Sequence, residues 1–157
     1  MKDQHILKKL IQLRGSIEHV IFKSFIKEYP LPEKLSQSHA VTIMILNHHK
    51  GESMSKLSKM VGMEKGSFTS VADRLIKLGY VVSERSEKDR RRYILKLTDK
   101  GVEFAKTFGK NHEKYIEAQI GALNDNDEKE FVDTVDTLLE KFEVLLLHSK
   151  FEKPTFK

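Results

Sequence analysis

The sequence lacks cysteine and tryptophan altogether, and its 157 residues include only three prolines. Without a thiol, the chain can form no disulfide and cannot sense oxidants through cysteine chemistry. No apolar run approaches the roughly 20 residues of a membrane span, and the opening Met-Lys-Asp-Gln-His lacks the apolar segment of a signal peptide. We therefore expect a cytoplasmic protein without membrane contact, built as one domain or as one domain with helical extensions.

Motifs for catalysis and for metal binding are also missing. The sequence contains no glycine-rich phosphate loop and no nucleophile elbow, so a general-base role for His48, His49 or His112 has no support and we expect no enzyme and no cofactor. There is no His-x-x-x-His pair. Neighbouring helical positions such as 48 and 49 diverge by about 100 degrees, so one ion is not expected to bind both. No metal site is predicted, and metal sensing stays an alternative trigger.

The charge of +5 is distributed unevenly along the chain. Residues 50–100 hold 13 basic and 7 acidic side chains, a net charge of +6, whereas residues 1–49 carry +3 and residues 101–157 carry −4. A basic central segment is what a face that neutralises nucleic-acid phosphates requires.

Two short helices are predicted within this basic segment, over residues 55–60 and 65–78. They are separated by Val61, Gly62 and Met63, which makes a helix-turn-helix with glycine in the turn. Apolar side chains of the second helix form one stripe: Phe68, Val71, Ala72 and Leu75. The remaining positions are small, polar or basic: Lys65, Gly66, Ser67, Thr69, Ser70, Asp73, Arg74 and Lys77. Such a face suits the major groove of DNA.

A hairpin is predicted directly after the helix-turn-helix. Residues 80–82 and 93–97 read as strands, and Thr98 stands where the N-cap of the next helix belongs. The tip between the strands is charged: Glu87, Lys88, Asp89, Arg90, Arg91 and Arg92. Because burying these charges would cost several kcal/mol per ion, the tip must face solvent or a polyanion. Helix-turn-helix and hairpin together predict a winged helix.

Long amphipathic helices are predicted on both sides of this unit. The first, over residues 6–28, is apolar on more than one side, so we expect it to pack between the winged helix and a second subunit. Tyr29-Pro30-Leu31-Pro32 ends it, and Ser36 or Ser38 caps the next helix, which runs to His49. Two more helices follow residue 101 and are separated by the polar residues 124–127.

The hairpin resembles the signature of the MarR family of bacterial transcription regulators, Asp-x-Arg-x-x-x-Leu-x-Leu-Thr-x-x-Gly. All of its fixed positions are matched, by Asp89, Arg91, Leu95, Leu97, Thr98 and Gly101. Asp73-Arg74-Leu75 and Gly79 match the usual end of the family's recognition helix. The resemblance implies a mainly α fold with a small β-hairpin wing, and a winged helix-turn-helix flanked by dimerisation helices. Its segments would be residues 1–35, 36–100, 101–148 and a basic tail over 149–157.

By this resemblance the chain is expected to be a sequence-specific DNA-binding regulator, a homodimeric repressor that binds a palindromic operator in double-stranded DNA and responds to a ligand. We predict base-edge contacts from Ser67 and Ser70, and phosphate contacts from Lys65 and Arg74. The other predicted DNA contacts are Thr69, Arg90, Arg91 and Arg92. Arg91 would reach the flanking minor groove, held by an ion pair with Asp89.

The resemblance also implies a small aromatic or anionic effector, bound between the winged helix and the dimer helices. The candidate pocket residues are Arg14, His19, Phe22, His48 and His49. Two alternatives stay open: a metal-responsive regulator of the same fold, and a helical interaction protein that never touches DNA. The second would explain the long amphipathic helices but not the basic hairpin.

Overall fold

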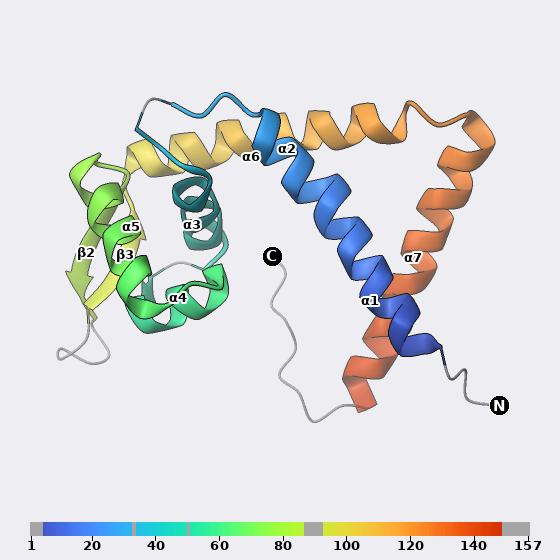
Figure 1. The fold of residues 1–157 in the computed structure, drawn as a ribbon, viewed down its shortest axis with the longest axis horizontal. Helices are drawn as coiled ribbons and strands as arrows, with labels where there is room; N and C mark the ends of the chain where they lie inside the picture. The colour runs from blue at the N-terminus through green and yellow to red at the C-terminus, as the bar shows by residue number, and fades with distance from the viewer. Residues whose placement is uncertain (1–4, 33, 50, 87–92, 149–157) are drawn as a thin grey trace. The chain divides into compact units, whose positions relative to one another are not determined.

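The computed structural model describes residues 5–32, 34–49, 51–86 and 93–148 (Figure 1). The predicted class is confirmed, because the described chain is mainly helical and holds a small three-stranded antiparallel sheet. The chain consists of two compact units, residues 1–112 and 113–157. Among the described helices, none combines the length and the apolar character that crossing a bilayer requires.

The N-terminal helical segment contains a π-helical turn. α1 (Ile6–Ile17) leads into η1 (Glu18–Lys23) and then into α2 (Ser24–Glu28). The backbone N–H of Ser24 donates to the carbonyl of His19, five residues earlier, and the Ser24 hydroxyl donates to the same oxygen at 3.0 Å. The predicted helix over residues 6–28 is therefore confirmed in extent, while the π turn, which holds one more residue than an α turn, was not predicted.

The next helix, α3 (Gln37–His48), is fixed at its start by a reciprocal cap. The backbone N–H of Ser36 donates to Nδ1 of His39 at 2.9 Å, and the Ser36 side chain receives the backbone N–H of His39. Of the two predicted caps, the structure therefore has Ser36. Inside the helix, Ile43 and Leu46 are buried in the core of the first unit.

The predicted helix-turn-helix is confirmed as α4 (Met54–Val61) and α5 (Lys65–Lys77). Gly62 ends α4 with φ of 72°, a left-handed conformation that glycine adopts without strain. The predicted apolar stripe of α5 is buried, with Phe68, Ala72 and Leu75 at 0% exposure. This packing fixes which face of α5 remains outside.

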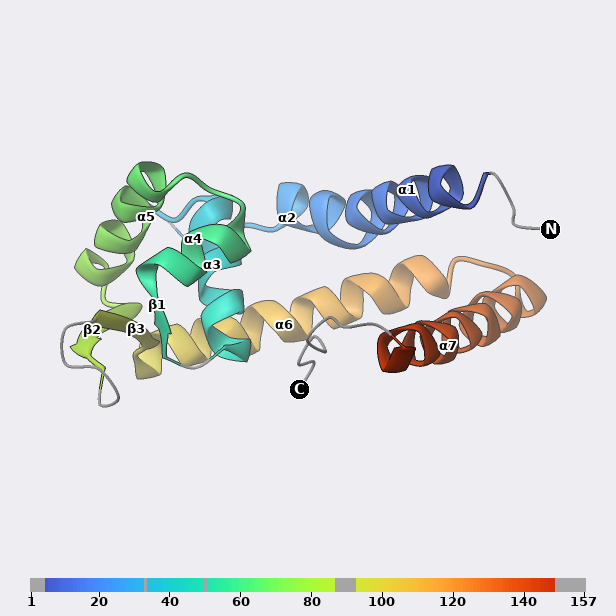
Figure 2. The ribbon, with the colours of Figure 1, turned by 90° about the horizontal axis from the view of Figure 1, so that it is seen from below.

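The wing strands are β2 (Val81–Arg85) and β3 (Tyr93–Leu97), paired antiparallel with Val81 opposite Leu97. β1 (Glu52–Ser53) pairs with the other edge of β3, which gives the strand order β1-β3-β2 (Figure 2). The sequence did not reveal β1, because two residues are too few to show an alternation. The charged tip, residues 87–92, lies outside the described residues.

The wing is joined to α6 (Asp99–Ile120) by the N-cap that the sequence predicts. The Thr98 hydroxyl accepts the backbone N–H of Gly101 at 3.1 Å and donates to the carbonyl of Gly79 at 2.7 Å. The backbone N–H of Thr98 donates to the carbonyl of Tyr80 at 3.1 Å. These bonds tie the start of α6 to the turn between α5 and β2.

An aromatic cluster holds α2 against α6. Phe25 lies 5.1 Å from Phe108 between ring centroids and stacks on His112 at 4.5 Å, while Tyr29 meets Phe108 at 4.8 Å. Nε2 of His112 lies 2.7 Å from the carbonyl oxygen of Ile21, within the π-helical turn, and donates to it. The N-terminal helical segment is thereby anchored to the winged helix through α6.

The second unit consists of the end of α6 and of α7 (Asp125–His148). Asn124, the first of the polar residues 124–127, caps α7, because its Oδ1 accepts the backbone N–H of Asp127 at 3.0 Å. No residue of α7 is buried, and its apolar side chains include Leu139 at 58% exposure and Leu145 at 63%.

Candidate nucleic-acid interface

The exposed face of α5 carries small, hydroxyl-bearing and basic residues at its start. Lys65, Ser67, Thr69 and Ser70 are all exposed and lie in its first two turns, where Gly66 adds no side chain. The α5 backbone can therefore approach another surface closely. The Thr69 hydroxyl donates to the carbonyl of Lys65 at 2.9 Å, so it can still accept a hydrogen bond but its proton is already used.

Arg74 lies in the last turn of α5 and is only half-exposed. It is near the start of α3, where its positive charge contributes to the environment of His39. Burial is the main cause that lowers the pKa of His39, and the Arg74 charge lowers it further. Both effects favour the neutral imidazole, which is the form that can accept the Ser36 backbone N–H.

The loop end of the wing strands adds positive charge. The Arg85 guanidinium lies over the Tyr93 ring, 5.8 Å from its centroid, and the two residues are paired across β2 and β3. On the same strands, Lys96 forms a 2.7 Å ion pair with Glu84. The predicted tip contacts Arg90, Arg91 and Arg92, with Asp89, lie outside the described residues.

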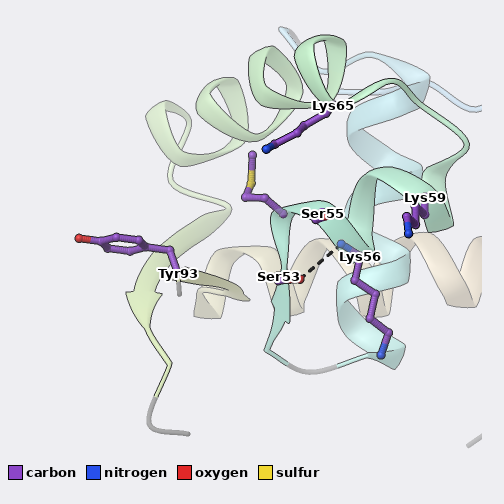
Figure 3. Close-up of a pocket in the computed structure, with 7 residues that line it drawn as sticks. Ser53, Ser55, Lys56, Lys59, Lys65 and Tyr93 are labelled. Atoms are coloured by element: carbon purple, nitrogen blue, oxygen red, sulfur yellow. Dashed lines mark hydrogen bonds between the residues drawn. The ribbon is translucent and has the colours of Figure 1, made fainter. Parts of the chain in front are cut away.

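A hollow of about 580 Å³ opens between α4, α5 and β3 (Figure 3). We call it the lysine hollow; it is lined by Ser53, Met54, Ser55, Lys56, Lys59, Lys65 and Tyr93. No acidic side chain is among the residues that line it. Figure 3 shows Lys65 reaching from α5 on one side, Lys56 and Lys59 on α4, and Tyr93 on the strand opposite.

The sequence did not single out Lys56, Lys59, Arg85 or Tyr93. Lys56 and Lys59 are both exposed on α4, three positions apart, which places them on one side of the helix. That spacing is the signal that could have identified them. Their position next to Lys65 depends on the packing of α4 against α5, which no linear pattern contains.

The five predicted effector-pocket residues lie in α1, in η1 and at the end of α3, all in the first unit. Arg14 and His19 are exposed, and Phe22 lies 5.6 Å from the His112 ring, in the N-terminal helical segment. His48 is the last residue of α3 and His49 follows it. None of the five lines the lysine hollow or either of two smaller hollows, one along α7 and one between α3, β3 and the start of α6. Within the same described ranges, no group of three or more His, Asp or Glu side chains could hold a metal ion.

Known proteins are similar to this chain in the region that contains the helix-turn-helix. The model of the MarR family matches residues 35–93. The transcriptional regulator Hpr of Bacillus cereus is 32% identical over 82 residues, which cover 52% of this chain and 42% of Hpr. The helix-turn-helix regulator YcgE of Bacillus subtilis is 41% identical over 51 residues, 32% of this chain and 33% of YcgE. The chain thus spans less than half the length of these curated relatives.

The fold extends beyond the matched region. The structure of Streptococcus pneumoniae FabT in complex with DNA aligns with a TM-score of 0.60 at 23% identity, and the alignment covers 90% of this chain and 98% of that one. The matched residues 35–93 contain α3, the helix-turn-helix, β2 and the start of β3. Sequence and fold agree with the wing signature: residues 35–93 match the MarR family, and the chain shares the fold of a MarR-type winged helix-turn-helix protein.

Proposed function

We propose that this protein is a sequence-specific DNA-binding transcription regulator that places α5 in the major groove of double-stranded DNA. The observation that carries the proposal is the outer face of α5, which is small, hydroxyl-bearing and basic over its first two turns, while the stripe Phe68, Val71, Ala72 and Leu75 is buried. A helix of this kind can bring its backbone close to base edges without leaving an apolar surface in water.

Each side of α5 has its own role in this proposal. Ser67 and Ser70 face base edges, and Thr69 serves as an acceptor because its proton is already donated to Lys65. Lys65 binds a phosphate. Arg74, which is half-exposed, reaches a phosphate from the last turn.

The wing supplies the second group of contacts. Arg91 enters the flanking minor groove, where narrow A·T-rich DNA concentrates negative potential, and Asp89 orients it. Arg90 and Arg92 bind neighbouring phosphates. The Arg85–Tyr93 pair at the loop end of β2 and β3 supports this proposal, because it places a further positive charge on the wing.

A homodimer on a palindromic operator fits the apolar surface of the chain. In the first unit, α1 exposes Ile6 at 52%, Leu7 at 68% and Ile11 at 63%, and in the second unit the apolar side chains of α7 are unburied. Large apolar side chains on both terminal helices are the pattern of an obligate interface. Two α5 helices would then enter successive major grooves about 34 Å apart.

The last part of the proposal concerns regulation. A small aromatic or anionic effector binds the protein in the cytoplasm and releases it from a promoter that it represses. Arg14, His19, Phe22, His48 and His49 are its candidate binding residues. The placement of Phe22 against His112 supports a link between such a pocket and α6. The response to a metal ion is the weaker alternative, since the described residues contain no three-ligand group.

The experiment that tests the proposal replaces Arg91 by alanine. We expect a loss of DNA affinity on the order of tenfold or more with folding and dimerisation unchanged, because a desolvated arginine in the minor groove makes contacts that water does not replace. Lys110→Ala, which removes an exposed charge from α6, is the matched control and should bind as the wild type does. Equal operator affinity of Arg91→Ala and wild type would refute the wing assignment, whereas a wild type that binds no duplex would favour a helical interaction protein.

A further inference from the structure

We propose that Lys100, in the first turn of α6, is a positioning residue that holds the C-terminal end of α5 in the orientation needed to read base edges. This inference rests on the proposed DNA binding. It assigns to Lys100 an effect on operator recognition that is exerted through α5, without contact between Lys100 and DNA.

α5 ends in a left-handed turn after its last helical residue. Gly79 has φ of 76°, and the backbone N–H groups of Gly79 and Tyr80 donate to the carbonyls of Ile76 and Leu75. These two bonds close the last turn of the helix. The carbonyls of residues 78–80 follow the turn, so they need donors from another part of the chain.

The start of α6 supplies a donor to each of these three carbonyls. Nζ of Lys100 donates to the carbonyl of Leu78, the C-cap residue of α5, at 2.8 Å. The Thr98 hydroxyl donates to the carbonyl of Gly79 at 2.7 Å, and the backbone N–H of Thr98 donates to that of Tyr80 at 3.1 Å. Lys100 is therefore the donor that reaches closest to the helical part of α5.

The position of Lys100 is unfavourable for its own helix. Lys100 is the second residue of α6, where a cation meets the positive end of the helix dipole. The C-terminus of α5 carries the opposite partial charge, so the ammonium group is stabilised there. The Tyr80 ring adds to this, since its centroid lies 4.3 Å from Nζ and the ring itself packs edge-on against Phe104 at 5.7 Å. The contacts with the end of α5 thus account for a lysine at this position.

The end of α5 lies close to the residues that are proposed to meet DNA. The backbone N–H of Leu78 donates to the carbonyl of Arg74 at 2.9 Å, so Leu78 is one helical turn beyond a proposed phosphate contact. A helix moves as a unit, and a tilt at its C-terminal end changes the distances from Ser67 and Ser70 to the bases. Hydrogen bonds to base edges weaken steeply with distance and angle, whereas attraction to phosphates extends over a Debye length of about 8–10 Å.

Loosening the end of α5 should therefore weaken specific binding more than non-specific binding. When only a fraction of the molecules hold a binding element in the competent orientation, the apparent affinity falls by that fraction. Binding to a random duplex depends on phosphates alone and tolerates a range of orientations. The ratio of operator affinity to random-duplex affinity is thus the quantity that reports a positioning role.

The test measures Lys100→Met, Lys100→Arg and the control Lys106→Met on a selected operator and on a random duplex, at several salt concentrations. Methionine removes the donor and the charge but keeps an unbranched stem and a high helix propensity. Lys106 is exposed on the same helix, so Lys106→Met removes an equal charge. Relative to this control, we expect Lys100→Met to lose operator affinity by about threefold to tenfold, with unchanged random-duplex affinity and salt slope. Lys100→Arg should restore operator affinity, because a guanidinium can donate to a carbonyl and stack on the Tyr80 ring.

Three results would overturn this inference while leaving the proposed function intact. The first is unchanged operator affinity of Lys100→Met. The second is an equal loss on both duplexes with a salt slope shallower by about 0.9, which would show that Lys100 binds a phosphate directly. The third is a loss of stability in urea denaturation with an unchanged ratio of operator to random affinity, which would assign Lys100 a purely structural role. A wild type without preference for any duplex sequence would refute the proposed function together with this inference.

Discussion

Gly101 is the glycine at which an added methyl group should destabilise the winged helix most. A Cβ at residue 101 would overlap the backbone carbonyl oxygen of Tyr80 and lie 3.1 Å from Cδ2 of Leu97. The same carbonyl accepts the backbone N–H of Thr98, whose side chain caps α6. Relief of the overlap requires the start of α6 to move away from the end of α5, against these bonds.

The magnitude follows from the contacts at stake. Overpacking a closed site costs about 1–3 kcal/mol, and each weakened hydrogen bond at Thr98 costs about 1 kcal/mol. The higher helix propensity of alanine returns at most about 1 kcal/mol. We expect Gly101→Ala to lower the free energy of unfolding by about 2–3 kcal/mol. For a chain of this length that corresponds to a fall in Tm of roughly 4–12 °C.

Urea denaturation followed by far-UV circular dichroism, at one fixed protomer concentration, measures the change. Gly109→Ala is the matched control in the same helix, because its Cβ would meet only Cε of Met44 at 3.8 Å. That variant should be as stable as the wild type or up to about 1 kcal/mol more stable. Equal stability of Gly101→Ala and Gly109→Ala would refute the close approach of α6 to Tyr80.

Two further predictions concern histidines. Folding lowers the pKa of His39 from its ordinary value of 6.5. The unfolded chain therefore binds the proton first, and stability should fall as pH decreases from about 6.5 toward the folded pKa. Thermal unfolding across this range should show a weaker dependence for His39→Gln, which keeps a capping box without titrating; parallel curves would contradict it. His112→Leu leaves the Ile21 carbonyl without its donor and should cost about 1–3 kcal/mol in urea denaturation, whereas equal stability of His112→Leu and wild type would exclude that bond as a stabilising contact.

The wing signature could be read from the sequence because several of its matched residues have a local physical task. Leu95 is buried at 1% exposure, Thr98 caps α6, and Gly101 occupies a position where any side chain would meet Tyr80. The apolar stripe of α5 could also be predicted, since apolar residues at a spacing of 3.6 indicate which face of a helix is buried. The winged helix and its outer face were therefore predictable.

Other features had no linear signal. The π-helical turn adds one residue to a helix whose apolar stripe is already wide, so the spacing of apolar side chains does not register it. β1 is two residues long and exists because β3 offers it an edge. The lysine hollow combines residues from β1, α4, α5 and β3, which lie up to 40 positions apart between Ser53 and Tyr93. Such a juxtaposition arises only from tertiary packing.

The central claim, sequence-specific binding of DNA by α5 and the wing, is tested most directly by selection from a random duplex library. The selected sites are then titrated at several salt concentrations with the purified full chain. We expect a palindrome whose half-sites lie about one helical turn apart, a preference of at least about a thousandfold over random DNA, and a steep salt dependence. The contradicting result is a shallow dependence with no recovered sequence, obtained again with protein that has been unfolded and refolded to remove any bound effector.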